Sequence, residues 1–381
     1  LYDIAEIGRR TTLAGNPAIP LVAMLTASVK ERDPAAAEFV HYGATSQDMI
    51  DTGLGAVAAA ATSLLLDRLQ ASAAALAGLA DRHRATPMIG RTLLQHALPM
   101  SFGLKCANWL HPLLPSLARL QAAAAPTPQF GGATGTLAAL GDKAMPVAAA
   151  LGADVPCHTA RIRPQALAAE LGILCSTLGK IARDVALLMQ TEVAEVFEPS
   201  APGKGGSSTL PHKRNPVQTV AIIAIATRTP GLVATMLAAG LQEHERGVGG
   251  WHAEWAVMRE LLTLSGAAAL HLRTLLEGLE VDPDRMRANL DLTQGLVMAE
   301  RVTFALAPSL GKARAKAFME AACQRAVAEK RHLGAVLGDM PESCGLDLGT
   351  LLDPAGYLGA SDAFIDRILQ LYEDQKSAAA V

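Results

Sequence analysis

Long apolar segments rich in alanine and leucine run through most of the chain. Residues 51–84 continue without a proline up to Thr86 and Pro87. At 1.5 Å per residue such a helix would be a rod of about 50 Å, and helices of this length are typical of bundles and coiled coils. The same pattern predicts five long helices, over 51–84, 98–123, 165–196, 212–240 and 253–279.

Segments rich in glycine and proline separate these helices, at 126–135, 152–164, 199–211 and 246–250. After "EVDPDRM" at 280–286 the pattern predicts shorter helices, over 283–288, 294–308, 311–331 and 361–375. We therefore expect three parts: an N-terminal segment over 1–47 that is incomplete, a central long-helix bundle with the active-site loops over 48–285, and a C-terminal helical domain over 286–381.

The most apolar stretch, residues 217–241, is long enough to cross a bilayer. Arg228 lies near its middle and is followed by Pro230 and Gly231, so a spanning helix would carry a charge at the least favourable depth. We therefore predict a helix buried on all sides inside a bundle, and no membrane.

Composition supports an all-α protein that binds neither nucleic acid nor a membrane. Apolar residues make up 50% of the chain but aromatic residues only 4%, which favours closely packed helices over a β-sandwich. A net charge of −3 gives no field that would attract nucleic acid or an anionic membrane. The five cysteines form no C-x-x-C pair, and no histidine pair has metal-ligand spacing. With no signal pattern at the start of the chain, we expect a cytoplasmic protein without metal or cofactor.

Polar residues concentrate at the predicted helix ends. "HYGATSQDMIDTG" at 41–53 places Thr45 and Ser46 before the longest helix and Asp48 and Asp51 near its first turn, a pattern that helix capping alone explains. "GRTLLQHALP" at 90–99 is consistent with a polar helix start. "QFGGATGTLAALG" at 129–141 is a Gly-rich turn whose free N–H groups could hold a carboxylate.

The segment "GKGGSSTLPHKRNP" at 203–216 is harder to explain structurally. Its glycines permit unusual backbone angles, and Pro211 is expected to begin a helix whose N–H groups and dipole attract an anion. Lys213 and Asn215 would lie in the first turn, where the dipole disfavours a lysine unless an anion binds. The pattern therefore predicts a bound carboxylate.

These residues carry a resemblance. "GSSTLPHKRNP" resembles the signature G-S-S-x-M-P-x-K-x-N-P of the fumarase/aspartase superfamily and differs only at Leu210, while "GATSQD" and "GRT..Q" resemble its two other active-site regions. The resemblance runs from about residue 15 to the C-terminus. It implies a fumarase/aspartase-like fold, in which five long helices from each of four subunits form a twenty-helix core. It also implies a homotetramer whose active sites are shared between subunits.

Within the superfamily, "QEHERGVGGWHAEW" and "NLDLTQGLVMAE" resemble a lactonising cycloisomerase branch, which acts on the tricarboxylate 3-carboxy-cis,cis-muconate. The alternative branch, adenylosuccinate lyase, resembles its relatives in using a histidine after G-R-T as general acid, and this chain has Leu93 there. Lactonisation needs no such acid, because the group that adds or leaves is a carboxylate with a pKa near 4. Another fumarate-releasing lyase and, from a different class, an inactive structural homo-oligomer remain open.

The resemblance assigns the acid/base role to Ser207. It places the substrate-binding role on a larger set of polar side chains, with His41 and Arg246 as further candidates: Thr45, Ser46, Thr92, Gln95, Ser208, Lys213, Asn215, His41 and Arg246. The expected intermediate is an aci-carboxylate, a carbanion next to a carboxylate, whose charge these groups must stabilise.

Overall fold

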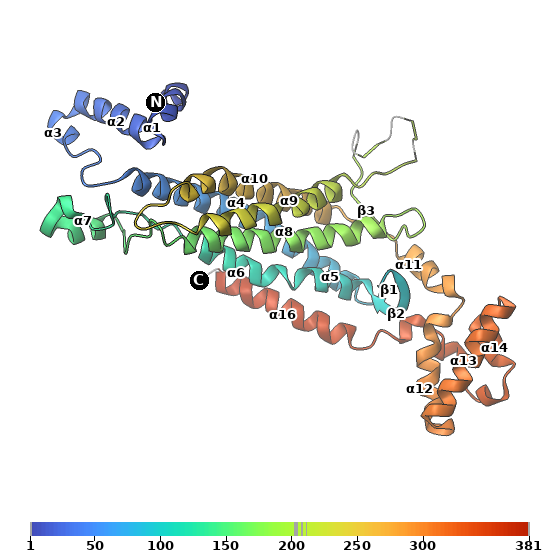
Figure 1. Cartoon of the computed structure of the whole chain (residues 1–381). Coiled ribbons are helices and arrows are strands. Elements are labelled where there is room, and N and C mark those ends of the chain that lie inside the picture. The colour runs from blue at the N-terminus through green and yellow to red at the C-terminus, as the bar shows by residue number, and fades with distance from the viewer. Residues whose placement is uncertain (1, 202–204, 207–208, 211, 380–381) are drawn as a thin grey trace. The chain divides into compact units, whose positions relative to one another are not determined.

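The computed structural model describes residues 2–201, 205–206, 209–210 and 212–379. The chain divides into two compact units: unit 1 (Leu1–Asp67, Ser116–Ser176 and Ile225–Ala268) and unit 2 (Arg68–Pro115, Thr177–Ala224 and Ala269–Val381). Four long helices, labelled in Figure 1, contribute a part to each unit: α4 (Ser46–Arg82), α8 (Ile162–Leu188), α9 (Val217–Ala239) and α10 (Gly250–Glu277). The predicted all-α architecture of long helices is confirmed.

Helix α4 has 37 residues and is therefore roughly 55 Å long. Alanine and leucine dominate its sequence, and leucines at helical spacing form its buried face, among them Leu65, Leu69 and Leu76. It begins at Ser46, five residues before the predicted start, because the Asp48 carboxylate accepts a hydrogen bond from the Thr45 N–H at 2.9 Å and caps the first turn.

Helix α9 is less buried than predicted, and it begins later than the predicted helix over 212–240. Only 22% of its most apolar window is buried, along one face that includes Ile222, Ile225 and Met236, so the prediction of burial on all sides is wrong for the single chain. Like α4, it is long and apolar enough to span a membrane by length and composition alone, which is weak evidence. The helix starts at Val217, since Asn215 precedes a proline and the residue before a proline is disfavoured in helical conformation.

The second predicted long helix, 98–123, is instead the end of a hairpin followed by two shorter helices. Strands β1 (Pro87–Thr92) and β2 (Gln95–Ser101) pair antiparallel, and α5 (Phe102–Leu110) and α6 (Leu113–Ala123) follow. Leu93 and Leu94 make the turn with φ of 51° and 64°, left-handed values that non-glycine residues rarely adopt. The predicted polar helix start at 90–99 is therefore a strand pair.

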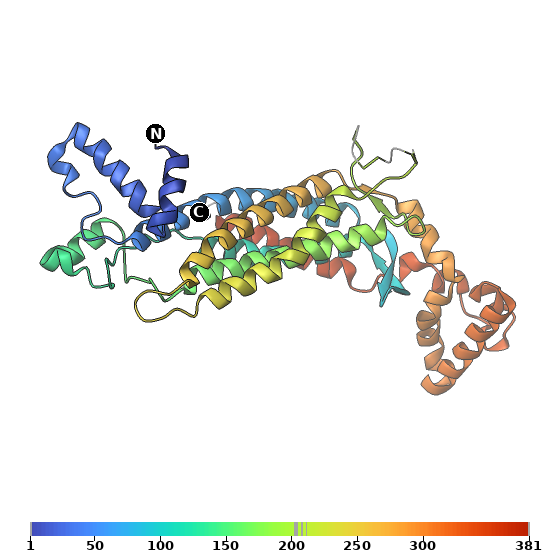
Figure 2. The same cartoon turned by 45° about the horizontal axis from the view of Figure 1, so that its top comes forward.

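In unit 1, α1 (Ile4–Ala14) packs against α2 (Ala18–Arg32), both dark blue in Figure 2. The short helix α3 (Pro34–Ala37) leads to the turn before α4. Phe130 and Leu137, from the Gly-rich segment, pack with Ala148 of α7 (Ala144–Ala150) in a small hydrophobic core. The Gly-rich segment is thus a packed loop.

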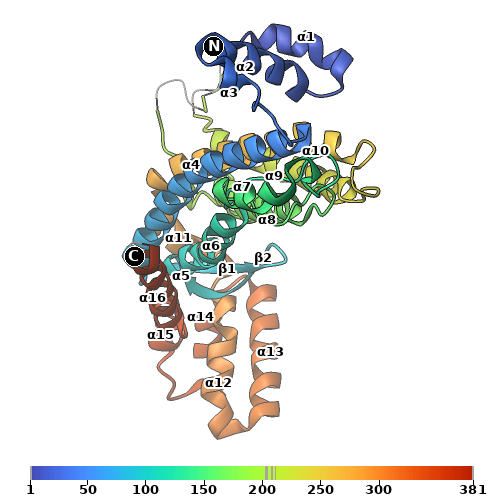
Figure 3. The same cartoon turned by 90° about the vertical axis from the view of Figure 1, so that its left-hand side faces the viewer.

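In unit 2, two short strands pair and a set of shorter helices follows: β3 (Val196–Phe197), β4 (Glu280–Val281), α11 (Pro283–Leu290), α12 (Ala299–Leu310), α13 (Lys312–Glu329), α14 (Leu333–Gly338), α15 (Leu348–Leu351) and α16 (Ser361–Ala379). Helices α12 and α13 run side by side (Figure 3) over a core that includes Leu306, Met319 and Leu337. The predicted C-terminal helices are confirmed, except that the one at 294–308 begins later, because Gln294 and Gly295 have left-handed φ.

Candidate active site

The predicted site residues fall into two groups, one in each unit. His41, Thr45, Ser46 and Arg246 belong to unit 1. The second group belongs to unit 2 and comprises Thr92, Gln95, Lys213 and Asn215. Ser207 and Ser208 lie outside the described residues.

Thr45 and Ser46 lie at the start of α4 after a tight turn. His41 and Gly43 both have positive φ, and the Ala44 N–H donates to the His41 carbonyl at 3.2 Å. Among the described residues, neither the hydroxyl of Thr45 nor that of Ser46 forms a hydrogen bond. Both are therefore available to a ligand.

Thr92 and Gln95 face each other across the first pair of the β1–β2 hairpin and are exposed. The hairpin is fixed by Arg91, whose guanidinium forms two hydrogen bonds, of 2.9 and 2.7 Å, with the fully buried Glu195 carboxylate. Asn289 of α11 donates to the same carboxylate at 2.8 Å. The ion pair thus holds the strand from which Thr92 projects.

Lys213 and Asn215 were predicted to lie in the first turn of α9. They precede the helix instead, because α9 starts at Val217, after Pro216. The N–H groups of Gln218 and Thr219 at the start of this helix donate to the Glu198 carboxylate at 3.0 and 2.8 Å. A carboxylate does bind this helix terminus, but Glu198 supplies it from within the chain. The side chains of Lys213 and Asn215 have no hydrogen-bond or ion-pair partner in the part of the chain that the structure describes.

The neighbouring Arg214 is held in place. It pairs with Glu280 at 2.9 and 2.8 Å, donates to the Glu198 carbonyl at 2.7 Å and lies 4.7 Å from the Phe197 ring centroid. These contacts fix the chain on the C-terminal side of the predicted catalytic loop.

The Gly-rich loop also holds a carboxylate of the chain itself. The N–H groups of Gly131 and Gly132 donate to Asp48 at 3.0 and 2.9 Å, and His158 Nε2 lies 2.6 Å from Asp48 Oδ1. Burial alone would raise the pKa of Asp48, but the hydrogen bonds from His158, Thr45 and Gly132 outweigh it and hold that pKa below its ordinary value. Asp48 is therefore an ionised anchor in addition to a helix cap.

Arg246, predicted to bind substrate, contacts the same loops. Its guanidinium donates to the Gln47 side-chain oxygen at 2.6 Å and to the carbonyls of Ala133 and Gly132 at 2.6 and 3.3 Å. Gln47 in turn donates to the His158 carbonyl at 2.7 Å. These contacts tie the start of α4 to the Gly-rich loop.

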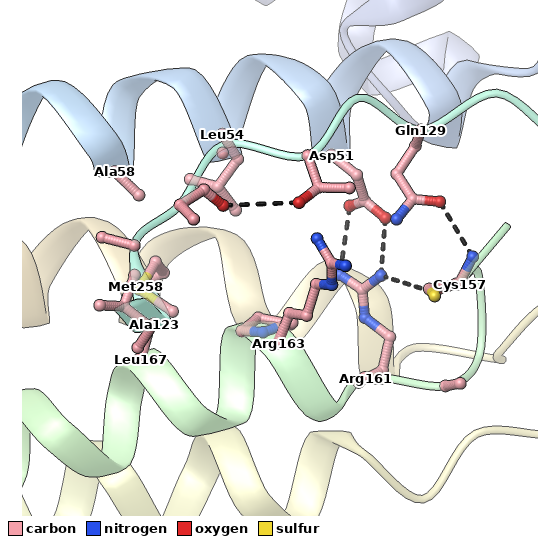
Figure 4. A pocket seen from close by; sticks show the side chains of 16 residues that line it. Asp51, Leu54, Ala58, Ala123, Gln129, Cys157, Arg161, Arg163, Leu167 and Met258 are labelled. Carbon is pink, nitrogen blue, oxygen red and sulfur yellow. Dashed lines mark hydrogen bonds and ion pairs between the residues drawn. The ribbon is translucent and has the colours of Figure 1, made fainter. Parts of the chain in front are cut away.

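A second buried cluster lies one turn further along α4. Arg161 pairs with both Asp51 and Glu254, and the Trp251 indole N–H donates to Asp51 at 2.9 Å. Figure 4 shows Asp51 and Arg161 at the polar end of a pocket whose apolar wall includes Leu54. Among the described residues, no predicted substrate-binding residue lines this pocket.

These anchoring partners could not be predicted because they are distant from each other in the sequence. His158 is 110 residues from Asp48, and Glu195 is 104 residues from Arg91. A single sequence contains no signal of such pairs. A charged residue among apolar ones, such as Glu254 between the tryptophans of "WHAEW", indicates that a buried charge needs a partner but does not identify that partner.

Comparisons with known proteins place the chain among lyases and cycloisomerases. A family model described as "Lyase" matches residues 12–231, and one described as "Adenylosuccinate lyase C-terminus" matches residues 295–368. A 3-carboxy-cis,cis-muconate cycloisomerase from Pseudomonas aeruginosa is 50% identical over 97% of this chain and 83% of its own length. A nitrosuccinate lyase from Streptomyces davaonensis is 44% identical over 96% of this chain and 81% of its own length.

A solved structure shows the same fold. The crystal structure of a 3-carboxy-cis,cis-muconate lactonizing enzyme from Pseudomonas putida matches with a TM-score of 0.94 and 48% identity, over 98% of this chain and 87% of that one. The motifs, the fold and these matches agree. The chain belongs to the lyase family of the fumarase/aspartase superfamily.

Proposed function

We propose that the protein is a cycloisomerase that interconverts 3-carboxy-cis,cis-muconate and 4-carboxymuconolactone, a step of protocatechuate breakdown. The observation that carries the proposal is that polar side chains on three motif loops have no partner among the residues that the structure describes. Thr45 and Ser46, Thr92 and Gln95, and Lys213 and Asn215 offer three pairs of groups for the three carboxylates of this substrate. The muconate-processing relatives named above support the same substrate.

In the forward direction one substrate carboxylate oxygen bonds to a carbon of the conjugated double bond. The electron pair of that bond moves to the adjacent carbon, which lies next to another carboxylate, and an aci-carboxylate results. Protonation of this carbon completes the lactone, and Ser207 is the proposed proton donor. In reverse, ionised Ser207 removes the proton. Free serine is too weak a base for this, so loop N–H groups and the Lys213 charge are proposed to lower its pKa.

The hairpin tip supports lactonisation over amine elimination. Leu93 is 96% exposed in the single chain and occupies the position where a general-acid histidine is expected in the alternative lyase branch. A carboxylate leaving group stays ionised at neutral pH and needs no proton, so an apolar side chain is compatible with the reaction.

The proposal includes a homotetramer with sites shared between subunits. Large apolar side chains on α4 and α9 are exposed in the single chain, among them Val57, Leu64 and Val220. Apolar surface of this extent is typical of an interface. Assembly would bring loops from unit 1 of one subunit to loops from unit 2 of others.

An ultraviolet assay tests the function directly. Loss of conjugation in 3-carboxy-cis,cis-muconate should be fast with the purified protein, and cleavage of adenylosuccinate, run in parallel, should be slower or absent. A faster reaction with adenylosuccinate would establish the alternative lyase activity. No turnover of either compound, or of nitrosuccinate, would favour the inactive structural oligomer.

A further inference from the structure

The carboxylate of Asp48 lies in an enclosed site built by three segments of unit 1. It accepts four hydrogen bonds: from the N–H groups of Thr45, Gly131 and Gly132, at 2.9, 3.0 and 2.9 Å, and from His158 Nε2 at 2.6 Å. A carboxylate is acceptor-only, so His158 Nε2 carries the proton in this contact. Asp48 is 3% exposed and His158 is 5% exposed, so water cannot replace these donors.

The two glycines are required for this arrangement. A Cβ atom on Gly131 would lie 2.7 Å from Pro156 Cβ and 2.8 Å from His158 Cε1. Gly132 has φ of +68°, and a Cβ atom there would lie 2.7 Å from the Gly43 carbonyl oxygen. The loop therefore packs so closely around Asp48 and the turn before α4 that no side chain fits.

The contacts make the turn before α4 depend on Asp48. Its Oδ2 atom binds both the Thr45 and the Gly132 N–H groups, while Oδ1 binds Gly131 and His158. One side chain thus joins the turn, the Gly-rich loop and the 156–161 segment. We call this set of contacts the Asp48 junction. It fixes the backbone of Thr45 and Ser46, and so the positions from which their hydroxyl groups project.

We propose that Asp48, supported by His158, is a positioning residue that orients Thr45 and Ser46 to bind one carboxylate of the substrate. Asp48 itself does not touch substrate, since all of its contacts are internal. The role in binding rests on the proposed function, whereas the junction of the three segments stands without it. The two parts are therefore tested separately.

Amide hydrogen exchange tests the junction without any substrate. In the wild type the amides of Thr45, Gly131 and Gly132 should be protected. Asp48→Asn keeps the size of the side chain but replaces one of its two acceptor oxygens with an NH₂ group, so exchange should accelerate at least about tenfold at the amides on that side, either Thr45 and Gly132 or Gly131. The matched control is Asp67→Asn, which changes an exposed aspartate on the same helix and should leave the three amides unchanged. Unchanged protection in Asp48→Asn would overturn the proposal.

Steady-state kinetics test the role in binding. Thr45 and Ser46 are proposed to bind the carboxylate that neither closes the lactone nor adjoins the carbanion. The charge of this carboxylate is the same in substrate, intermediate and product, so loss of its site should raise KM, by about tenfold or more, with kcat changed less. His158→Gln retains an N–H donor and should keep KM within about threefold of the wild type, whereas His158→Leu should raise KM as Asp48→Asn does. A purely structural role would lower active enzyme concentration and leave KM unchanged in all three variants, and that result would refute the proposal.

The two tests can be interpreted even if one variant does not fold or the wild type is inactive. If Asp48→Asn does not fold, the His158→Gln and His158→Leu pair provides both the exchange and the kinetic comparison. If the wild type does not convert the muconate, the proposed function fails while hydrogen exchange still decides whether Asp48 holds the loops together.

Discussion

Arg161 and Glu254 form a bidentate ion pair in the interior of unit 1, with Nη2 2.6 Å from Oε2 and Nε 2.9 Å from Oε1. The same guanidinium donates to Asp51 at 2.6 Å. One cation therefore faces two buried carboxylates, and the Trp251 indole supplies a further donor to Asp51. Removing a single partner leaves an uncompensated buried charge, which costs far more than the net value of the pair.

Arg161→Leu should lower the free energy of unfolding by roughly 3–5 kcal/mol at pH 7. The control is Arg163→Leu two residues along, where the arginine is exposed and the expected change is within about 0.5 kcal/mol. Urea unfolding at a fixed protein concentration measures both. Burial raises the pKa of Glu254 despite Arg161, so part of the loss in Arg161→Leu should be regained as the pH falls and Glu254 takes up a proton. Equal stability of the two variants would contradict this account.

The lowered pKa of Asp48 gives a stability difference that depends on pH. The unfolded chain takes up a proton near the ordinary value of 3.8, and the native state does so only at lower pH. The contribution of ionised Asp48 to the free energy of unfolding is therefore complete above about pH 5. It is lost as the pH falls below the pKa of the unfolded chain and then below the lower pKa of the native state. The difference in unfolding free energy between wild type and Asp48→Asn should shrink below about pH 4. A difference that stays constant to pH 3 would show that the Asp48 charge contributes nothing.

Ser207→Ala should abolish turnover while the fold and the oligomer stay intact. Loss of a positioned acid/base typically lowers the rate by 10²- to 10⁴-fold or more. The ultraviolet assay measures kcat, and circular dichroism with light scattering checks the fold and assembly. A variant that retains more than about a tenth of the wild-type kcat would exclude Ser207 as the acid/base. Ser208→Ala is the matched control on the adjacent hydroxyl and should lose less activity.

Assembly should depend on the exposed apolar face of α4. Val57 and Leu64 are seven residues apart, each is 61% exposed, and they lie on the same side of the helix. Light scattering at micromolar concentration should give an oligomer mass for the wild type and a smaller mass for Leu64→Glu, since a buried unpaired charge disfavours the interface. A monomeric wild type would contradict both the oligomer and the shared site.

Mixing two impaired variants tests whether active sites are shared between subunits. Ser207→Ala and Thr45→Ala should each be weakly active alone. If sites combine loops of different subunits, mixing the two variants during subunit exchange should recover part of the wild-type activity. Mixing that yields only the sum of the separate activities would show that each site comes from one chain.

Leu93→His should not accelerate lactonisation. The leaving carboxylate needs no proton between pH 6 and 9, and a polar group beside the apolar diene should slow the reaction. Leu93→Met, which keeps an apolar side chain, serves as the control and should change kcat little. A severalfold gain in cycloisomerase activity in Leu93→His would overturn the assignment to the lactonising branch but not the superfamily.

The long helices were predictable because long segments rich in alanine and leucine favour a helix over strands and loops. The β1–β2 hairpin could not be predicted. Two-residue hairpin turns with positive φ usually contain glycine or asparagine, but here Leu93 and Leu94 adopt these left-handed conformations. The sequence predicts that α9 begins near Pro211, because a proline is favoured at the first position of a helix, but the helix begins at Val217, directly after Pro216. Whether the predicted binding residues act on substrate remains a prediction.

The two expected anion sites show what local sequence cannot decide. A Gly-rich loop and a helix N-terminus both predicted a bound carboxylate, and each holds one, from Asp48 and Glu198. Free N–H groups indicate that an anion is needed and do not say where it comes from. Only the tertiary structure distinguishes an internal aspartate from a ligand.

The Asp48 junction also determines which residues would have to be transferred together to rebuild this part of the site in another protein. Grafting "GATSQD" onto another helical scaffold would transfer the hydroxyls without the groups that aim them. A working transplant would have to include Gly131, Gly132 and His158 from segments that start 83 residues downstream. The transferable unit is therefore a three-dimensional cluster, which no short peptide around the motif contains.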